Sequence, residues 1–462
     1  MLKNKLTLPM QGAALCVSAI LAAPAVQSAN WLMLQGTENP KAPKHRMFGF
    51  IQPSYTHNVA DPMTGLSGPL VANNGKVVAQ NLISPKFDDQ TGFHVRRARL
   101  GFRGKLTDEI NYFTLFEVAP NLLTYDAFGD RARDIALDHV SLTFNQIPGA
   151  RVRLGLFKNP GSEESYQAIH VFDYIEFTDF TAREVLERFV TGVRSPAASA
   201  QGNIGTITST AYGFNGVRDW GIQVFDHVKK DNWDFSYAVK VGRGEDIQSS
   251  DDNNFNPELY LYGSAEYDLP GGKGARKNGV KLYAWRQQGK RDFETDPLER
   301  EYDRVRQGIG FKALGNLFGS SYKHRLSGEL MFAEGVIFLA PAGNVPGGAL
   351  QYAVDDDNKA RGFYLDYGFY LDNHWQFDVR YDQNNLLYET AADVDPGNER
   401  EIRAWTFGVN YHFTPKLRLT ANYIKREAEA PVAYANAALT ADVRTTVSNL
   451  DDRLAVQLTW LF

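Results

Sequence analysis

The sequence predicts an all-β fold: a transmembrane antiparallel β-barrel of about sixteen strands, with one long constriction loop folded inward. The clearest evidence is a strict alternation of residue character from Trp405 to Tyr423, where apolar residues occupy every second position on both sides of the turn at 414–416. A period of two places the two sets on opposite faces of a strand. We expect the apolar face to contact lipid and the polar face to line an aqueous lumen.

The C-terminal residues repeat this pattern. Leu454, Val456, Leu458, Trp460 and Phe462 alternate with smaller or polar residues up to the last position of the chain. This repeat supports the same orientation, with the apolar face towards lipid and the other face towards the lumen.

Residues 1–29 have the features of a signal peptide. Lys3 and Lys5 precede an apolar run at about 13–23, and small residues offer cleavage sites after Ala25 or Ala29. An uncleaved membrane anchor would need a longer run, of roughly 18 residues. Cys16, the one cysteine, lies within this segment. The barrel domain, 30–462, therefore has no disulfide and no thiolate metal site.

No later segment approaches the roughly 18 consecutive apolar residues that a membrane-spanning helix requires. A closed barrel is the other structure that satisfies every backbone polar group in lipid. The net charge of −5, which becomes −7 without Lys3 and Lys5, is not typical of a nucleic-acid-binding protein. The sequence indicates no cofactor and no metal ligands.

Sixteen segments have the length and alternation of strands that span an outer membrane. They are 46–55, 93–106, 110–118, 135–145, 151–157, 220–227, 233–243, 259–269, 279–287, 303–313, 324–333, 359–371, 375–384, 402–413, 417–425 and 453–462. Short turns alternate with long connections, and an even number of strands places both termini on the short-turn side. A soluble all-β repeat protein is the alternative.

The longest connection, from 158 to about 218, contains many apolar residues in its first part. A loop of this length and character needs a surface to pack against, and the barrel interior would provide one. The alternative is one or two additional strands between 204 and 217, which would change the strand count.

If apolar positions face lipid, the opposite positions place basic residues in the lumen. An arginine facing lipid would cost about 2–4 kcal/mol at the bilayer midplane, which fixes the orientation of each strand. Glu117, Asp234, Glu329 and Asp378 also fall on the inner face. A salt bridge within the wall is therefore an alternative role for each individual arginine.

Residues 158–194 carry seven acidic and four basic side chains, a net charge of −3. An acidic loop opposite a basic wall would create an electric field across a narrow channel and sort solutes by charge. The alternative is a solvated surface loop, which the aromatic residues of this segment disfavour.

Several motifs resemble the phosphate-selective porin O and P family. They are the segment from His94 to Leu106 followed by Tyr112 and Phe116, the segment from Arg153 to Pro160, Leu186-Glu187-Arg188, and the strand pair at 218–221 and 233–244. The resemblance implies a sixteen-stranded trimeric porin of the bacterial outer membrane whose pore-facing Arg and Lys side chains contact anions. By matching motif, it implies pore roles for Arg97, Arg99, Arg103 and Lys158.

Strand orientation and resemblance together give a set of candidate pore-lining or anion-contact residues. The candidates are Arg97, Arg99, Arg103, Lys105, Arg151, Arg153, Lys158, Arg188, Arg304 and Arg306.

The sequence favours passive diffusion of small hydrophilic solutes, anionic or neutral, with an anion preference that extends to phosphate-type anions. A general porin that uses the loop-to-wall field without binding an anion is the alternative. A barrel enzyme is a more remote alternative. His139 and Ser141 share one face, as a base and a nucleophile could, but Asp138 is expected on the other face. We expect a lipid-embedded homotrimer with no catalytic residues.

Overall fold

We analysed a computed structural model of the chain. It describes residues 30–80, 85–87, 91–120, 134–187, 189–193, 204–211, 217–244, 256–272, 274–292, 301–339, 350–392, 394–450 and 452–462. The predicted signal peptide, residues 1–29, lies outside the described residues.

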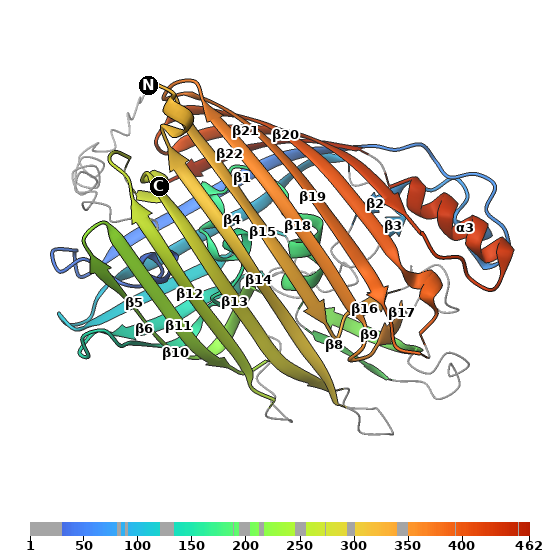
Figure 1. Ribbon diagram of the computed structural model, residues 1–462, viewed down its shortest axis with the longest axis horizontal. Coiled ribbons are helices and arrows are strands. Elements are labelled where there is room, and N and C mark those ends of the chain that lie inside the picture. Colours follow the sequence, from blue (N-terminus) through green and yellow to red (C-terminus); the bar gives the residue numbers. More distant parts are fainter. Residues whose placement is uncertain are drawn as a thin grey trace, which may run out of the picture.

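Within the described part of the chain, sixteen antiparallel strands form a closed barrel (Figure 1). They are β1 (Arg46–Val59), β4 (Gly92–Lys105), β5 (Ile110–Glu117), β6 (Ala136–Phe144), β7 (Arg151–Lys158), β10 (Arg218–Lys230), β11 (Trp233–Gly242), β12 (Glu258–Asp268), β13 (Gly279–Asp292), β14 (Glu301–Gly315), β15 (Lys323–Glu334), β18 (Lys359–Tyr370), β19 (Trp375–Glu389), β20 (Arg400–Thr414), β21 (Leu417–Glu429) and β22 (Asp452–Leu461). Each strand pairs with its sequence neighbours in the wall, and β22 closes the ring by pairing with β1. The predicted fold class is confirmed, and each expected segment corresponds to one wall strand.

Residues 204–211, which the structure describes within the segment at 204–217, are not part of the wall. Four other strands form a separate sheet in the order β16-β17-β9-β8, where β8 is Phe189–Val193, β9 is Ile204–Ala211, β16 is Ile337–Leu339 and β17 is Leu350–Val354. The alternative of an additional strand at 204–217 is therefore correct locally, but it leaves the barrel count unchanged. A further pair, β2 (Val78–Gln80) and β3 (Pro85–Phe87), lies in the connection after β1.

In the described residues, helices are few and lie before β1 or in the connections between strands. They are α1 (Trp31–Leu34), α2 (Glu163–Tyr166), α3 (Ala437–Ser448), the π-helical turn η3 (Thr181–Val185), and the 3₁₀ turns η1 (Gly68–Asn73), η2 (Ile169–Val171), η6 (Gly274–Arg276), η7 (Leu317–Gly319) and η9 (Pro396–Asn398). In the described part of the chain, none of these helices has the length and apolar character needed to cross a bilayer.

The helix α3 projects from one end of the barrel, opposite the C-terminus (Figure 1). The sequence pattern predicted only a long connection between the strands at 417–425 and 453–462. The Asn436 side chain caps α3 by accepting hydrogen bonds from the backbone N–H groups of Ala438 and Leu439. An asparagine directly before an alanine-rich stretch is the local signal that could have predicted this helix.

The side chains of the wall face the directions that the alternation predicts. On β4, Leu100 and Phe102 are 36% and 43% exposed on the outer surface, whereas Arg97 and Arg99 are 1% and 3% exposed. On β11, a row of exposed apolar residues alternates with buried residues that include Lys240. An apolar outer surface over a polar interior is the arrangement of a membrane barrel.

One inner position differs from the prediction. Asp138 was expected on the outer face of β6, but it is fully buried and bonds to wall arginines. The reason is a bulge: Leu115 pairs with His139, and the next residue of β5, Phe116, pairs with Leu137, so that Asp138 is the extra residue. A bulge turns an additional side chain to the inner face.

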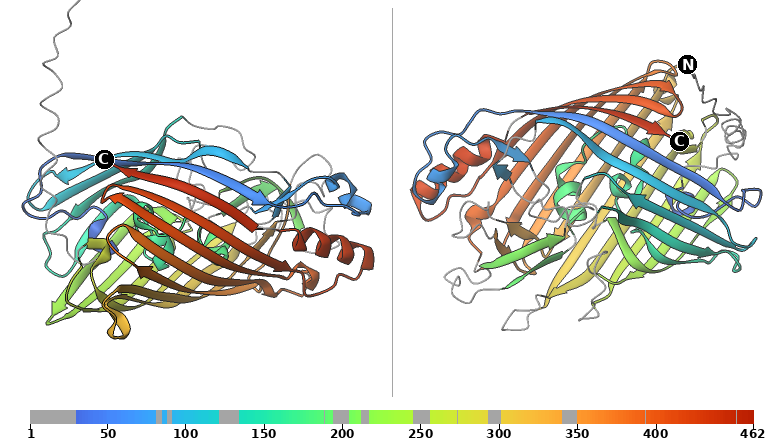
Figure 2. Two further views of the ribbon diagram at one scale, coloured as in Figure 1. Left: turned by 90° about the horizontal axis from the view of Figure 1, so that it is seen from above. Right: turned by 180° about the vertical axis from the view of Figure 1, so that it is seen from behind.

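The barrel interior is filled in part by two segments that are not strands. One is the inner loop, defined here as residues 159–187, whose short helical turns lie within the ring of strands (Figures 1 and 2). The other is the N-terminal segment, residues 30–45. Both contribute to the largest apolar cluster, which includes Trp31, Leu32 and Tyr166.

Candidate pore site

The inner loop is held to the wall at its start by Lys158, the last residue of β7. The Lys158 ammonium donates to the backbone carbonyls of Ser165 at 2.8 Å and Gln167 at 2.6 Å. These carbonyls lie at the end of α2, where a short helix leaves them without intrahelical partners. Lys158 therefore fixes the direction in which the loop enters the lumen.

Phe180 anchors the far part of the inner loop. Its side chain packs against Gly362 on β18, where a Cβ atom would lie only 2.7 Å from the ring. Glycine at this inner position leaves space that any other residue would fill, so the loop can contact the wall closely.

The first acidic residue of the inner loop, Glu163, lies between two lysines of neighbouring strands. Lys281 and Lys312 approach its two carboxylate oxygens at 2.6 and 3.2 Å. Burial alone would raise the pKa of the Glu163 carboxyl, but the two ammonium groups lower it to about 2. One negative charge therefore faces two positive charges at this point.

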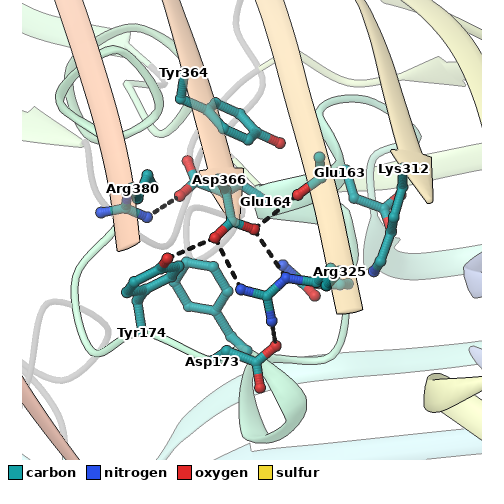
Figure 3. A pocket seen from close by; sticks show the side chains of 12 residues that line it. Glu163, Glu164, Asp173, Tyr174, Lys312, Arg325, Tyr364, Asp366 and Arg380 are labelled. Carbon is teal, nitrogen blue, oxygen red and sulfur yellow. Dashed lines mark hydrogen bonds and ion pairs between the residues drawn. The ribbon is translucent and has the colours of Figure 1, made fainter. Parts of the chain in front are cut away.

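Asp173 has three arginine partners, and Figure 3 shows the ion pair with one of them, Arg325. Arg276 approaches it at 3.3 Å and Arg418 at 3.4 Å, and Arg325 also forms an ion pair with it. Arg325 bonds in addition to the wall carboxylate Asp366 at 2.8 Å. Arg276 and Arg418 therefore share a single described loop carboxylate.

The other acids of the inner loop are also bound. Glu164 pairs with Arg380 at 2.7 Å, and Glu176 lies between Arg96 at 2.9 Å and Arg453 at 3.2 Å. The charged residues drawn in Figure 3, which include Glu164, Asp173 and Arg325, surround a cavity of about 30 Å³, close to the volume of one water molecule.

Arg304 and Arg306 on β14 hold the end of the inner loop. Arg304 pairs with Glu187 at 3.3 Å and with Glu258 at 2.6 Å. Arg306 donates to the Glu184 carbonyl at 2.8 Å and pairs with Glu187 at 3.3 Å. These two predicted pore residues therefore contact the loop backbone as well as its carboxylates.

The acidic loop and the basic wall were expected to face each other across a channel. In the structure they are in direct contact, because the loop crosses the lumen and its acids reach the wall cations. Ion pairs at this distance cancel most of the field that separated charges would create. The electrostatic potential of the interior therefore depends on whether cations or carboxylates are in excess.

The predicted basic row on β4 is brought together on the inner face. Arg97 donates to Gln52 at 3.1 Å, and Arg99 pairs with Glu117 at 2.9 Å. Arg103 pairs with Glu38, and Lys105 donates to the Pro40 carbonyl at 2.6 Å. Arg103 and Lys105, at the C-terminal end of the row, therefore contact the N-terminal segment.

Arg151 and Arg153 on β7 also contact other protein groups. Arg151 pairs with Asp226 on β10. Arg153 is fully buried, donates to the Leu32 carbonyl at 3.1 Å and stacks over Phe225 at 4.4 Å. The last predicted residue, Arg188, lies outside the described residues.

The contribution of the N-terminal segment was not foreseen. The Trp31 indole donates to Glu163 at 3.0 Å, and Gln35 donates to the Tyr166 carbonyl at 2.9 Å. Apolar residues immediately after a predicted cleavage site were the available signal, but they could equally have belonged to the export sequence. The segment connects the wall at Arg153 to the inner loop.

One contact fits the remote alternative of a barrel enzyme. His139 and Ser141 are within hydrogen-bond distance, at 2.8 Å, on the inner face of β6. Asp138, the nearest carboxylate in sequence, instead bonds to Arg99 at 3.2 Å and Arg218 at 2.9 Å. Among the described residues, His, Cys, Asp and Glu side chains form no group of three or more that could hold a metal ion.

A family model described as phosphate-selective porin O and P matches residues 79–250. This match confirms the family resemblance over that part of the chain. No curated protein sequence matches the chain.

Among solved structures, the chain is similar to an anion-selective porin from Comamonas acidovorans, with a TM-score of 0.51, 13% identity, and coverage of 91% of this chain and 100% of that one. It is also similar to the outer membrane channel DcaP of Acinetobacter baumannii, with a TM-score of 0.51, 11% identity, and coverage of 93% and 100%. At these identities the likeness concerns the fold. Together with the family match over residues 79–250, it supports a channel of the porin type rather than an enzyme.

Proposed function

We propose that this porin allows passive diffusion of small hydrophilic solutes and prefers anions. The observation that carries the proposal is the charge ratio along the inner loop. Glu163, Asp173 and Glu176 each contact two or more wall cations. Positive charge is therefore left over beside the loop, and in a narrow channel such charge favours anions.

The cations involved come from different wall strands and, for Arg276, from the turn after β12, and they face the same interior. The pairs are Lys281 and Lys312 at Glu163, Arg276 and Arg418 at Asp173, and Arg96 and Arg453 at Glu176. Several of these were not in the predicted set, which concentrated on the rows of β4, β7 and β14. In this proposal, Arg97 and the other predicted residues support the positive potential of the interior.

Reversal potentials in planar bilayers test the proposal. Under a KCl gradient, we expect the purified protein to show a potential whose sign corresponds to chloride permeating faster than potassium. A clear preference for potassium would refute the anion preference while leaving the channel itself intact.

A general porin is the second candidate, and the pairing of the arginine rows favours it. Arg99 is bound to two carboxylates and Arg304 to two others, so these side chains are partly neutralised. In that case phosphate would not block the chloride current at millimolar concentration. A phosphate-type anion preference requires such a block.

We further propose that the chain is exported through a signal peptide cleaved before Asn30 and acts as a homotrimer in the lipid bilayer. The Asn30 side chain donates to Ser236 at 2.7 Å, a contact compatible with Asn30 at a free end of the chain. Trimer formation follows from the family resemblance. N-terminal sequencing of the protein from outer membranes, and native mass spectrometry in detergent, test the two points separately.

A further inference from the structure

A second cavity lies at the short-turn end of the barrel. It adjoins the cluster of Figure 3, because Arg276 and Arg418, which line this cavity, pair with Asp173 of that cluster. It has a volume of about 400 Å³ and is bounded by the inner loop, the turn after β12 and the β20–β21 hairpin. Its charged and imidazole side chains are His170, Arg276, His374, His412, Lys416 and Arg418. Among the described residues that line it, none is acidic.

Arg276 reaches this cavity because the turn before it folds back sharply. Gly271, Gly272 and Gly274 have φ values of 91°, 69° and 64°, which favour glycine. A Cβ atom at Gly272 would lie 2.3 Å from the Arg276 carbonyl oxygen. The Arg276 guanidinium then lies over the Tyr370 ring at 5.4 Å. The turn thus positions a cation at the mouth of the barrel.

His412 supports the same guanidinium. Both terminal nitrogens of Arg276 lie 3.3 Å from His412 Nε2. Because a guanidinium can only donate, the imidazole nitrogen accepts. The second imidazole at the rim, His374, donates through Nδ1 to the His412 carbonyl at 2.7 Å, which directs its Nε2 away from the backbone.

Arg418 is the buried cation of the cavity, at 5% exposure. One terminal nitrogen donates to the Phe172 carbonyl at 2.6 Å, and the other pairs with Asp173 at 3.4 Å. Its Nε has no hydrogen-bond partner among the described residues. A buried donor without a partner is costly and is commonly satisfied by a ligand or water.

The charged side chains around the cavity sum to a net charge of +1. Asp173 is shared between Arg276, Arg418 and Arg325, and Arg325 is also paired with Asp366 and Asp378, so these three cations and three carboxylates balance. The excess comes from Lys323 and Lys416 against Asp372.

The Lys323 ammonium donates to the Arg276 carbonyl at 2.5 Å. The Asp372 carboxylate accepts from the backbone N–H groups of His374 and Trp375, each at 2.7 Å. The exposed Lys416 adds a cation at the rim. Burial and the nearby Arg418 lower the pKa of His170 to about 4, so its ring is neutral at pH 7. A neutral imidazole has one donor and one acceptor nitrogen with which to contact a ligand.

We propose that this cavity is a binding site for a small oxyanion with two or more negative charges, such as phosphate, sulfate or a short dicarboxylate. Arg276 and Arg418 supply charge-assisted hydrogen bonds, and His170, His374 and Lys416 surround the remaining oxygens. The site rests on the proposed function and extends it, because it adds a saturable anion-binding site at the mouth of the pore. It is not needed for passive diffusion itself.

Isothermal titration of the full-length mature protein in detergent with sodium sulfate tests the site, with inorganic phosphate, succinate and chloride as further arms. We expect saturable binding of the divalent anions at ~10 mM or below and none of chloride. Arg276→Gln should weaken sulfate binding by about tenfold or more, because it removes a charged donor without removing a backbone contact of the inner loop. The matched control is Lys230→Gln, an exposed lysine at the same end of the barrel.

Lys416→Gln provides a second variant that leaves the fold untouched, since Lys416 is exposed on the hairpin. We expect an intermediate loss of sulfate affinity. Sulfate affinity equal to wild type in both Arg276→Gln and Lys416→Gln would overturn the proposal, as would equal loss in the Lys230→Gln control or no saturable sulfate binding by wild type.

Reversal potentials separate this proposal from the proposed function. If the wild-type pore lacks anion preference but Arg276→Gln still abolishes sulfate binding, the cavity remains a binding site and the proposed function fails. If anion preference is present but sulfate does not bind, the proposed function remains and the site is wrong. A preference among the divalent anions identifies which of them fits the cavity best.

Discussion

The Trp31 indole donates a hydrogen bond to the Glu163 carboxylate at 3.0 Å, which joins the N-terminal segment to the start of the inner loop. Trp31 is 4% exposed and belongs to the same apolar cluster as Tyr166 and Phe180 of that loop. The first described residues of the chain therefore take part in shaping the interior of the barrel.

Trp31→Ala should loosen this junction. Replacing a buried tryptophan by alanine costs about 3–5 kcal/mol where the site cannot collapse. The wall of the barrel retains its strand pairing, so we expect the loss to appear as a more open and noisier channel together with a lower unfolding temperature. Single-channel conductance and thermal unfolding measure the two effects.

Trp233→Ala is the control, because Trp233 lies on the outer surface of β11, 44% exposed. It should leave conductance unchanged. Identical conductance for the Trp31 variant and wild type would show that the N-terminal segment does not affect the permeation path.

Lys158→Met should release the beginning of the inner loop. The substitution keeps the length of the side chain but removes the donor to the carbonyls of Ser165 and Gln167. Buried carbonyls without partners cost about 1–3 kcal/mol, and the loop gains mobility. We expect conductance to fluctuate between levels in single-channel records.

The control for that change is Lys359→Met, which removes a half-buried lysine paired with the exposed Glu389 near the end of the wall. Steady single-channel currents from Lys158→Met, like those expected of this control, would mean that Lys158 does not hold the loop.

The strands and their orientation could be predicted from the sequence because a period of two is a local property. Arg97 and Leu100 show this: three positions of separation and the cost of an arginine in lipid were enough to place them on opposite faces. The bulge at Asp138 could not be foreseen, because it depends on how β5 and β6 pair, and no residue type marks it.

The contacts of the inner loop depend on residues that are far apart in the chain. Asp173 and Arg276 are 103 positions apart, and they meet only because the loop crosses the lumen and a turn folds inward. The sequence indicated an acidic loop and a basic wall but not their partners. For the same reason the predicted set consisted mainly of basic rows within single strands and did not include Arg276 or Arg418.

Arg306→Met should destabilise the end of the inner loop and shift selectivity towards cations. The change leaves the Glu184 carbonyl without its donor and removes one of the two arginines that face Glu187. Breaking a buried pair by removing one partner costs about 3–5 kcal/mol. Chemical unfolding and the chloride-to-potassium permeability ratio, both relative to wild type, measure the result.

Arg286→Met serves as the comparison, since Arg286 is only half-buried and bonds to glutamines rather than to the loop. It should change neither quantity by more than a small fraction of the Arg306 effect. A permeability ratio that rises in Arg306→Met would contradict the assignment of Arg306 as a cation that offsets the loop carboxylates.

Glu163→Gln should increase anion preference, because it leaves Lys281 and Lys312 without their shared carboxylate while keeping the shape of the side chain.

The wild-type protein should retain the Glu163 charge over a wide pH range, since the pKa of this carboxyl group is lowered from 4.5 to about 2. A carboxyl group with a lowered pKa stabilises the fold fully above its unfolded value, and this contribution is lost as pH falls from about 4.5 towards 2. The difference in permeability ratio between wild type and Glu163→Gln measures the part that depends on Glu163. We expect it to stay constant from pH 7 to pH 4.5, to fall to about half near pH 2 and to vanish only below that pH. Glu301→Gln, at an exposed pair with Lys290, should show no such difference from wild type. If the difference between wild type and Glu163→Gln disappears already at pH 5, the tight lysine pair around this carboxylate is wrong.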